Sequence, residues 1–173
     1  MKYLVVSDSH GDKEILEKLI ANYAGKVDAM FHCGDSELAY DDEVFMHFNV
    51  VSGNCDYDQN LKTEQFFTIG TDKILLVHGH LLGVGFGLNS LQLEMQEYGA
   101  NMAFFGHTHQ LGVEKVADRL ILNPGSISYP RGKYQAIGGT YALVESLPTQ
   151  INVQFYNRDL EPIPELQVTF DGK

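Results

Sequence analysis

The chain has 173 residues, with 12 Lys or Arg against 23 Asp or Glu, so its formal net charge is −11. Its length is that of one ordinary domain, and a hydrophobic content of 44% is enough to bury a core. The acidic balance argues against a protein that tracks along nucleic acid or binds an acidic membrane surface.

No apolar run approaches the roughly 18 residues of a membrane span. The apolar start of the chain ends at Ser7-Asp8, too early for a signal peptide. Two cysteines, Cys33 and Cys55, cannot build a disulfide framework. We therefore expect a cytoplasmic protein without membrane segments.

The first third of the chain predicts strands around a helix. An apolar run at 3–6 predicts a buried strand, and apolar residues at helical spacing over 15–23 predict a helix that ends before Gly25. Residues 27–31 predict a second strand, and 50–51 the end of a third. This βαβ beginning is typical of an α/β sheet.

The remainder predicts a second helix among more strands. Strands are expected at 66–69, 74–77 and 102–105, with a helix over 88–98 that ends at Gly99. Further strand-like stretches cover 111–116, 120–122, 141–144 and 151–155. Since no repeat or linker interrupts the chain, we expect a single domain over 1–173, with a two-sheet core and helices outside.

Polar residues follow five of these predicted strands. Ligands of open α/β sheets bind outside the carboxyl ends of the strands, so these residues are expected to converge. They are Asp8-Ser9-His10, Gly34-Asp35, Gly53-Asn54, His78-Gly79-His80 and Gly106-His107-Thr108-His109.

The converging residue types indicate metal chemistry. Imidazole and carboxylate together suit Mn, Fe, Zn, Co or Ni. Seven ligands are too many for one transition metal ion, but they suit two ions that share one bridging carboxylate. Any one of these motifs alone is common in ordinary turns, whereas all of them in this order predict a two-metal site that hydrolyses phosphoesters.

The same motifs resemble the calcineurin-like metallophosphoesterases. Within that superfamily, Gly53-Asn54-Cys55-Asp56 and Asn123-Pro124-Gly125-Ser126 are similar to the small bacterial and archaeal phosphodiesterase branch. The resemblance implies an α/β fold, namely a four-layer α/β/β/α sandwich of two mixed sheets flanked by helices.

The resemblance also implies roles for individual residues. Asp8, His10 and His109 would hold one metal, and Asn54, His78 and His107 the second. Asp35 would bridge the two ions, so Asp35 and Asn54 are expected to act in catalysis. The family usually uses Mn²⁺, and some members use Ni²⁺, Fe²⁺ or Zn²⁺. Hydroxide formed from a water shared by the metals would then attack the phosphoester.

One position departs from the pattern of the superfamily. Many members have His directly after the metal-binding Asn, where this chain has Cys55, and a neutral thiol is a poor proton donor. A proton for the leaving group is then expected from water, His80 or Asp56, with a local structural role as the alternative for His80. Arg131 is a candidate phosphate ligand, or else an exposed loop residue.

The leading hypothesis is a phosphodiesterase that acts on small phosphodiesters rather than long nucleic acid. A phosphomonoesterase of the same fold is the first alternative. A non-catalytic scaffold, like the metallophosphoesterase-like subunit of eukaryotic retromer, is the second. Homo-oligomers remain possible, and the natural substrate is left open.

Overall fold

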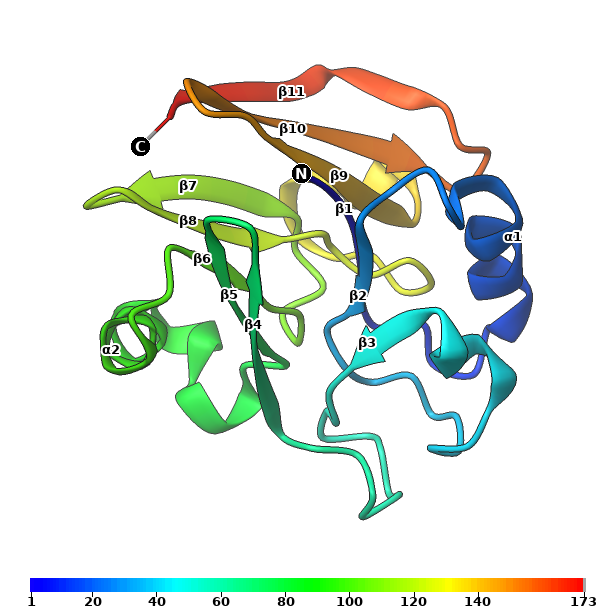
Figure 1. Cartoon of the computed structure of the whole chain (residues 1–173). Helices are drawn as coiled ribbons and strands as arrows, with labels where there is room; N and C mark the ends of the chain where they lie inside the picture. The colour runs from blue at the N-terminus through cyan, green and yellow to red at the C-terminus, as the bar shows by residue number, and fades with distance from the viewer. Residues whose placement is uncertain (173) are drawn as a thin grey trace.

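The computed structural model describes residues 1–172, which form two mixed β-sheets (Figure 1). Across the first sheet the strands are β11 (Pro162–Asp171), β10 (Gln150–Asn157), β9 (Thr140–Ser146), β1 (Lys2–Val6), β2 (Ala29–His32) and β3 (Phe48–Val50). Across the second they are β4 (Glu64–Ile69), β5 (Asp72–Val77), β6 (Met102–Phe104), β8 (Arg119–Asn123) and β7 (Gly112–Val116). The strands β1, β2 and β3 are parallel, as are β5, β6 and β8.

Helical crossovers connect the parallel strands. Helix α1 (Lys13–Tyr23) links β1 to β2, and α2 (Asn89–Tyr98) links β5 to β6. The Asp12 side chain caps α1 by accepting a bond from the Ile15 amide, and α2 ends at Gly99 with a φ of +64°. Short 3₁₀ turns cover η1 (Glu43–Met46), η2 (His80–Leu82), η3 (Val84–Phe86) and η4 (Gly132–Ile137).

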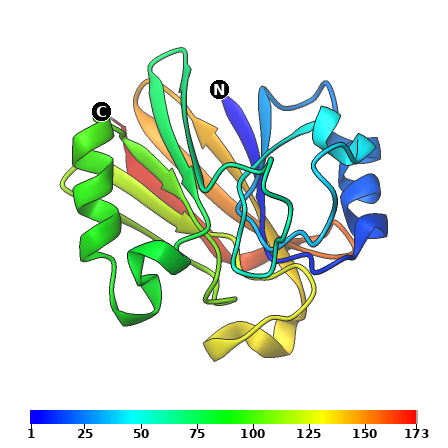
Figure 2. The same cartoon turned by 90° about the horizontal axis from the view of Figure 1, so that it is seen from below.

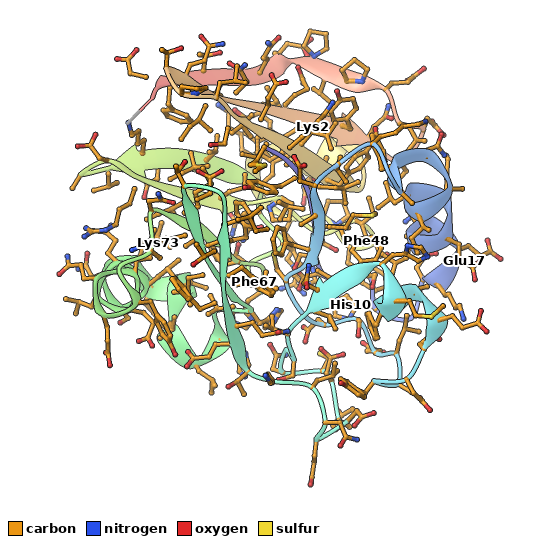
Figure 3. The ribbon with its side chains drawn as sticks, in the orientation of Figure 1. Lys2, His10, Glu17, Phe48, Phe67 and Lys73 are labelled. Carbon is orange, nitrogen blue, oxygen red and sulfur yellow. The ribbon has the colours of Figure 1, made fainter. Side chains whose placement is uncertain are left out.

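Three apolar clusters join these elements into four layers. The central cluster fills the space between the sheets (Figure 3), where the rings of Phe31 and Phe67 pack edge to face at 5.3 Å. A second cluster packs Leu16 and Leu19 of α1 against the first sheet, and a third packs Leu91 of α2 against the second sheet. The helices therefore lie on opposite outer faces, which confirms the predicted α/β/β/α sandwich (Figure 1).

The helices and strands expected from the sequence are all present with small shifts at their ends, and one strand of the structure was not expected. β2 begins at Ala29 rather than at residue 27. The analysis missed β11, because Pro162 and Pro164 disfavour a strand in the sequence. β11 pairs only with β10 at the sheet edge, where a missing amide donor is tolerated. Within residues 1–172, no helix has the length and apolar character to span a membrane.

Candidate metal centre

The polar segments predicted at strand ends meet at one end of the sandwich. Asp8 follows β1, Asp35 follows β2, and Asn54 follows β3 in the first sheet. His78 follows β5, and the segment with His107 and His109 follows β6 in the second. The loops that carry them gather on the side seen in Figure 2. All seven predicted ligands therefore lie together, four from the first sheet and three from the second.

Asp8, His10 and His109 form one half of the site. The Nε2 atoms of His10 and His109 are 3.3 Å apart, and Asp8 Oδ1 lies 3.2 Å from His109 Nε2. With Asp35 added, the ligand atoms of this group all lie within 4.8 Å of one another. The set offers two imidazoles and two carboxylates, which suits a first-row divalent transition metal.

Asn54, His78 and His107 form the other half, and Asp35 lies between the halves. Asn54 Oδ1 is 3.1 Å from His78 Nε2 and 2.9 Å from His107 Nδ1. Asp35 Oδ2 lies 3.3 Å from His78 Nε2, although Asp35 also belongs to the first group. A carboxylate in contact with both groups is placed as a bridge between two cations would be.

Three of the imidazole rings, those of His10, His78 and His109, have a hydrogen-bond acceptor at Nδ1. In the neutral ring the proton is therefore on Nδ1, and the lone pair of Nε2 faces the site. The Nδ1 atoms of His78 and His109 donate to the carbonyls of Cys33 and Tyr129 at 2.8 and 2.7 Å. His10 Nδ1 lies 2.7 Å from Glu37 Oε1, which can only accept. Each neutral ring is left with an unprotonated Nε2 that faces other acceptors.

The Asp8 carboxylate supports the same conclusion. Its side chain is fully buried, and neither oxygen accepts a hydrogen bond, although Oδ1 lies near His109. A buried carboxylate without donors is costly unless a cation or a proton compensates it. The converging acceptors and this unsatisfied carboxylate are the donor set that divalent metal ions require, so the residues fit the metals that the sequence predicts.

The backbone around the ligands is unusually constrained. Five of the seven have positive φ, from +46° to +67°, namely Asp8, His10, Asp35, His107 and His109. Such conformations are unfavourable for residues with a Cβ and persist where the surrounding structure holds them. Two glycines keep space for the carboxylates, because a Cβ on Gly53 would collide with Asp35 and one on Gly106 with Ser7 and Asp8.

Burial and hydrogen bonding set the protonation of the central groups. Burial alone would raise the pKa of Asp35, but the His78 ring beside it and the bond from the Cys55 amide outweigh burial and hold that pKa well below its usual range. Burial and the Asp35 charge raise the pKa of the Cys55 thiol to about 11. At neutral pH Asp35 is therefore an anion and Cys55 an uncharged thiol, as the sequence analysis expects for Cys55.

The other predicted residues differ in their access to the site. A cavity of about 230 Å³ opens onto the ligands, and Arg131 is among its lining residues. The His80 ring packs near His78 and His107, with centroids 5.3 and 6.2 Å away, but it does not line that cavity. Arg131 thus lies in the wall of the cavity at the ligands, whereas His80 packs beside the ligand rings outside it.

Asp56 organises the loops that carry the ligands. Its carboxylate accepts bonds from the amides of Asp35, Glu37 and Gly53 and from the Ser36 hydroxyl, at 2.7–3.0 Å. These four bonds tie the loop after β2 to the loop after β3, and both loops carry ligands. The Gly-Asn-Cys-Asp motif is the sequence signal for this role.

The sequence analysis missed Glu37, which contacts His10 although 27 residues separate them. It has a φ of +57°, in a loop whose path the sequence does not reveal.

The segment that begins at Asn123 borders the site, since Ser126 Oγ donates to the Asp8 carbonyl at 2.8 Å.

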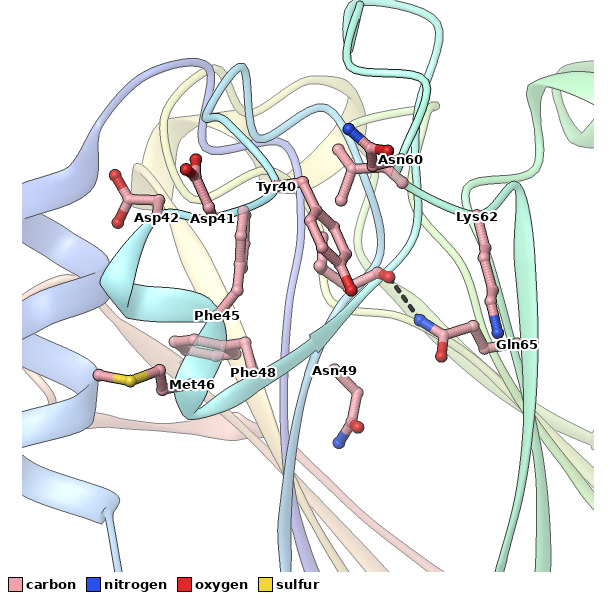
Figure 4. A pocket seen from close by; sticks show the side chains of 12 residues that line it. Tyr40, Asp41, Asp42, Phe45, Met46, Phe48, Asn49, Asn60, Lys62 and Gln65 are labelled. Carbon is pink, nitrogen blue, oxygen red and sulfur yellow. Dashed lines mark hydrogen bonds between the residues drawn. The ribbon is translucent and has the colours of Figure 1, made fainter.

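A larger cavity of about 390 Å³ lies beside the edge strand β3, away from these ligands (Figure 4). Gln65 Nε2 crosses it to the Val50 carbonyl at 2.6 Å, and the Asp42 carboxylate is paired with Lys13 at 3.0 Å. Its lining includes no His or Cys, so it lacks the imidazole and thiolate ligands that transition metals favour.

Comparison with known proteins agrees with this fold. Residues 1–147 match the calcineurin-like phosphoesterase superfamily domain. The chain is 38% identical to the probable metallophosphoesterase YsnB of Bacillus subtilis, over 96% of this chain and 97% of that protein. The chain therefore belongs to the calcineurin-like phosphoesterase superfamily. This membership identifies it as a phosphoric ester hydrolase of a metal-dependent family.

Solved structures share the fold. A predicted phosphoesterase from Streptococcus pneumoniae superposes with a TM-score of 0.95 at 39% identity, covering 98% of this chain and 97% of that one. Vps29 of Entamoeba histolytica in complex with Zn²⁺ has a TM-score of 0.72 at 22% identity, with 99% of each chain covered. The second likeness is one of fold alone.

Proposed function

We propose that the protein is a two-metal phosphodiesterase that hydrolyses small phosphodiesters. The observation that carries the proposal is the convergence of three unprotonated imidazole nitrogens and the unsatisfied Asp8 carboxylate around Asp35. Two divalent cations there would lower the pKa of a shared water and neutralise the charge that develops on the phosphoryl group.

The side chains of the site divide the remaining tasks. Asp8, His10 and His109 would hold one cation and Asn54, His78 and His107 the other, with Asp35 between them. Glu37 would orient His10 and increase its basicity as a ligand, because it accepts the Nδ1 proton. Arg131 would bind a free oxygen of the phosphate from the cavity wall.

Charge favours a diester over a monoester. Three carboxylates, those of Asp8, Asp35 and Glu37, contact the imidazole ligands and would offset much of the charge of two divalent cations. Two divalent cations against these three carboxylates leave a charge of 4 − 3 = +1, which a singly charged diester balances, whereas a doubly charged monoester would leave an uncompensated negative charge. Because the Cys55 thiol is a weak acid, esters with good leaving groups should react fastest.

The experiment is a rate comparison on metal-free protein reconstituted with Mn²⁺, Ni²⁺, Zn²⁺ or Fe²⁺. We expect bis(p-nitrophenyl) phosphate to be hydrolysed faster than p-nitrophenyl phosphate, and about two equivalents of metal to bind per chain. Faster hydrolysis of the monoester would support the phosphomonoesterase alternative. Metal binding without turnover of any phosphoester would support a scaffold.

A further inference from the structure

We propose that Tyr129 and Arg131 form one wall of the cavity and that this wall selects phosphoesters carrying a planar aromatic group. The inference rests on the proposed phosphoesterase function and adds the class of ester group that the site prefers. Both residues line the cavity with His10, Asp35 and Asn54. The segment that carries them projects from the sandwich at the edge where the ligand loops meet, in yellow in Figure 2.

The backbone of this wall is tied to a ligand. The Tyr129 carbonyl accepts from His109 Nδ1 at 2.7 Å, and the Arg131 amide donates to the His109 carbonyl at 2.9 Å. The Tyr129 amide donates to Ser126 Oγ at 2.7 Å, and that hydroxyl also binds the Asp8 carbonyl. The position of Tyr129 is therefore fixed relative to Asp8 and His109, two ligands of the first metal half-site.

The Tyr129 side chain takes no part in these bonds. It is 58% exposed, although its ring centroid is only 5.2 Å from that of His10. When a ligand packs on an exposed aromatic ring whose backbone is already held in place, little conformational entropy is lost on binding. Aromatic rings pack best against other rings in offset or edge-to-face arrangements. A planar aromatic ester group is therefore the best partner for the Tyr129 ring.

Arg131 gives the wall a second function. A guanidinium can bind phosphate oxygens in a bidentate manner, and here it lies two residues from the aromatic ring on the same anchored segment. A phosphoester with its phosphoryl group at the ligands and near Arg131 would place an ester substituent beside Tyr129. Aryl esters and nucleoside esters share the required planar ring.

The test measures binding separately from turnover, by calorimetry on the Mn²⁺-loaded protein. The ligands are phenylphosphonate against methylphosphonate, and adenosine 5′-monophosphate against ribose 5-phosphate. In each pair the aromatic ligand is expected to bind more tightly. Tyr129→Ser should reduce that preference by roughly 2- to 10-fold, whereas Tyr129→Phe should retain it. A reduced preference of Tyr129→Ser in either pair supports the proposal. The pair with the larger reduction shows whether the site prefers an aryl group or a nucleobase.

Tyr57 supplies a matched control. It is 92% exposed, lies three residues after Asn54, and does not line this cavity. Tyr57→Ser should therefore leave both preferences unchanged. If Tyr129→Ser weakens both members of each pair equally, or lowers Mn²⁺ affinity instead, the ring merely supports His10 and the proposal is wrong. Loss of all turnover with preserved ligand preferences would count against the proposed function but not against this wall.

Discussion

Burial of His32 should make the stability of the metal-free protein fall in mild acid. The ring is fully buried, and it accepts a bond from the Gly34 amide at Nδ1, so Nε2 carries the proton toward the Ser9 hydroxyl. Burial lowers the pKa of His32 from 6.5 to about 4. Above pH 6.5 the ring is neutral in both folded and unfolded chains and contributes no pH dependence.

Below pH 6.5 the unfolded chain takes up a proton at His32 that the folded chain does not. The free energy of unfolding therefore decreases as the pH falls, and the loss is complete only below about pH 4. A shift of this size corresponds to about 3 kcal/mol in the acid limit and about 2 kcal/mol between pH 7 and pH 5.

The assay is urea unfolding at pH 7 and pH 5 in the presence of a chelator, for the wild type and His32→Gln. Carboxylates titrate in both proteins, so the difference between the two pH responses isolates the imidazole. The wild type should lose about 2 kcal/mol more than the variant. Parallel responses, within about 0.5 kcal/mol, would refute the reasoning. If the variant does not fold, NMR of the wild-type His32 ring should still find it neutral at pH 5.

Three further predictions concern the site. The Asp35→Asn variant should bind less than two equivalents of metal, and its turnover should fall at least about 100-fold. Its circular dichroism spectrum should be unchanged. Undiminished turnover would contradict the bridging role. Glu37→Gln should weaken Mn²⁺ binding by about 10- to 100-fold in calorimetric titration, and an unchanged affinity would show that His10 needs no orienting carboxylate. Gly106→Ala should lower stability by about 1–3 kcal/mol in urea, whereas Gly112→Ala, whose added Cβ meets no atom within 4 Å, should not; equal effects would contradict the close approach of Gly106 to Asp8.

The sequence predicted the parts of the molecule that periodicity and strand order determine. Runs such as 3–6 and 74–77 are buried on both faces, so they appear as continuous apolar segments. Ligands such as Asp8 and His78 follow these runs directly, and the carboxyl ends of parallel strands meet at one edge. Within each sheet, the convergence of the ligands therefore follows from the topology.

Residues whose position depends on a loop conformation were not predictable in this way. Glu37 reaches His10 through a loop with positive φ, and Tyr129 reaches His109 across 20 residues. β11 was not predicted for a different reason: Pro162 and Pro164 disfavour a strand, and its burial does not alternate near the shift of register with β10 between Gln154 and Tyr156. At this shift Gln154 Nε2 donates a hydrogen bond to the Ile163 carbonyl. The alternation of apolar and polar residues in a strand sequence does not reveal such a side-chain bond.

The acidic composition and the chemistry of the site are consistent once charge is considered locally. A net charge of −11 disfavours long polyanions over the surface as a whole. At the strand ends, however, unprotonated imidazoles face one another and Asp8 has no donor, so the folded chain concentrates acceptors that only cations can satisfy. Bound cations would turn this small region positive within an acidic surface. Such a surface admits one phosphate group at a time, and Arg131, a cation on the cavity wall, adds to the attraction there.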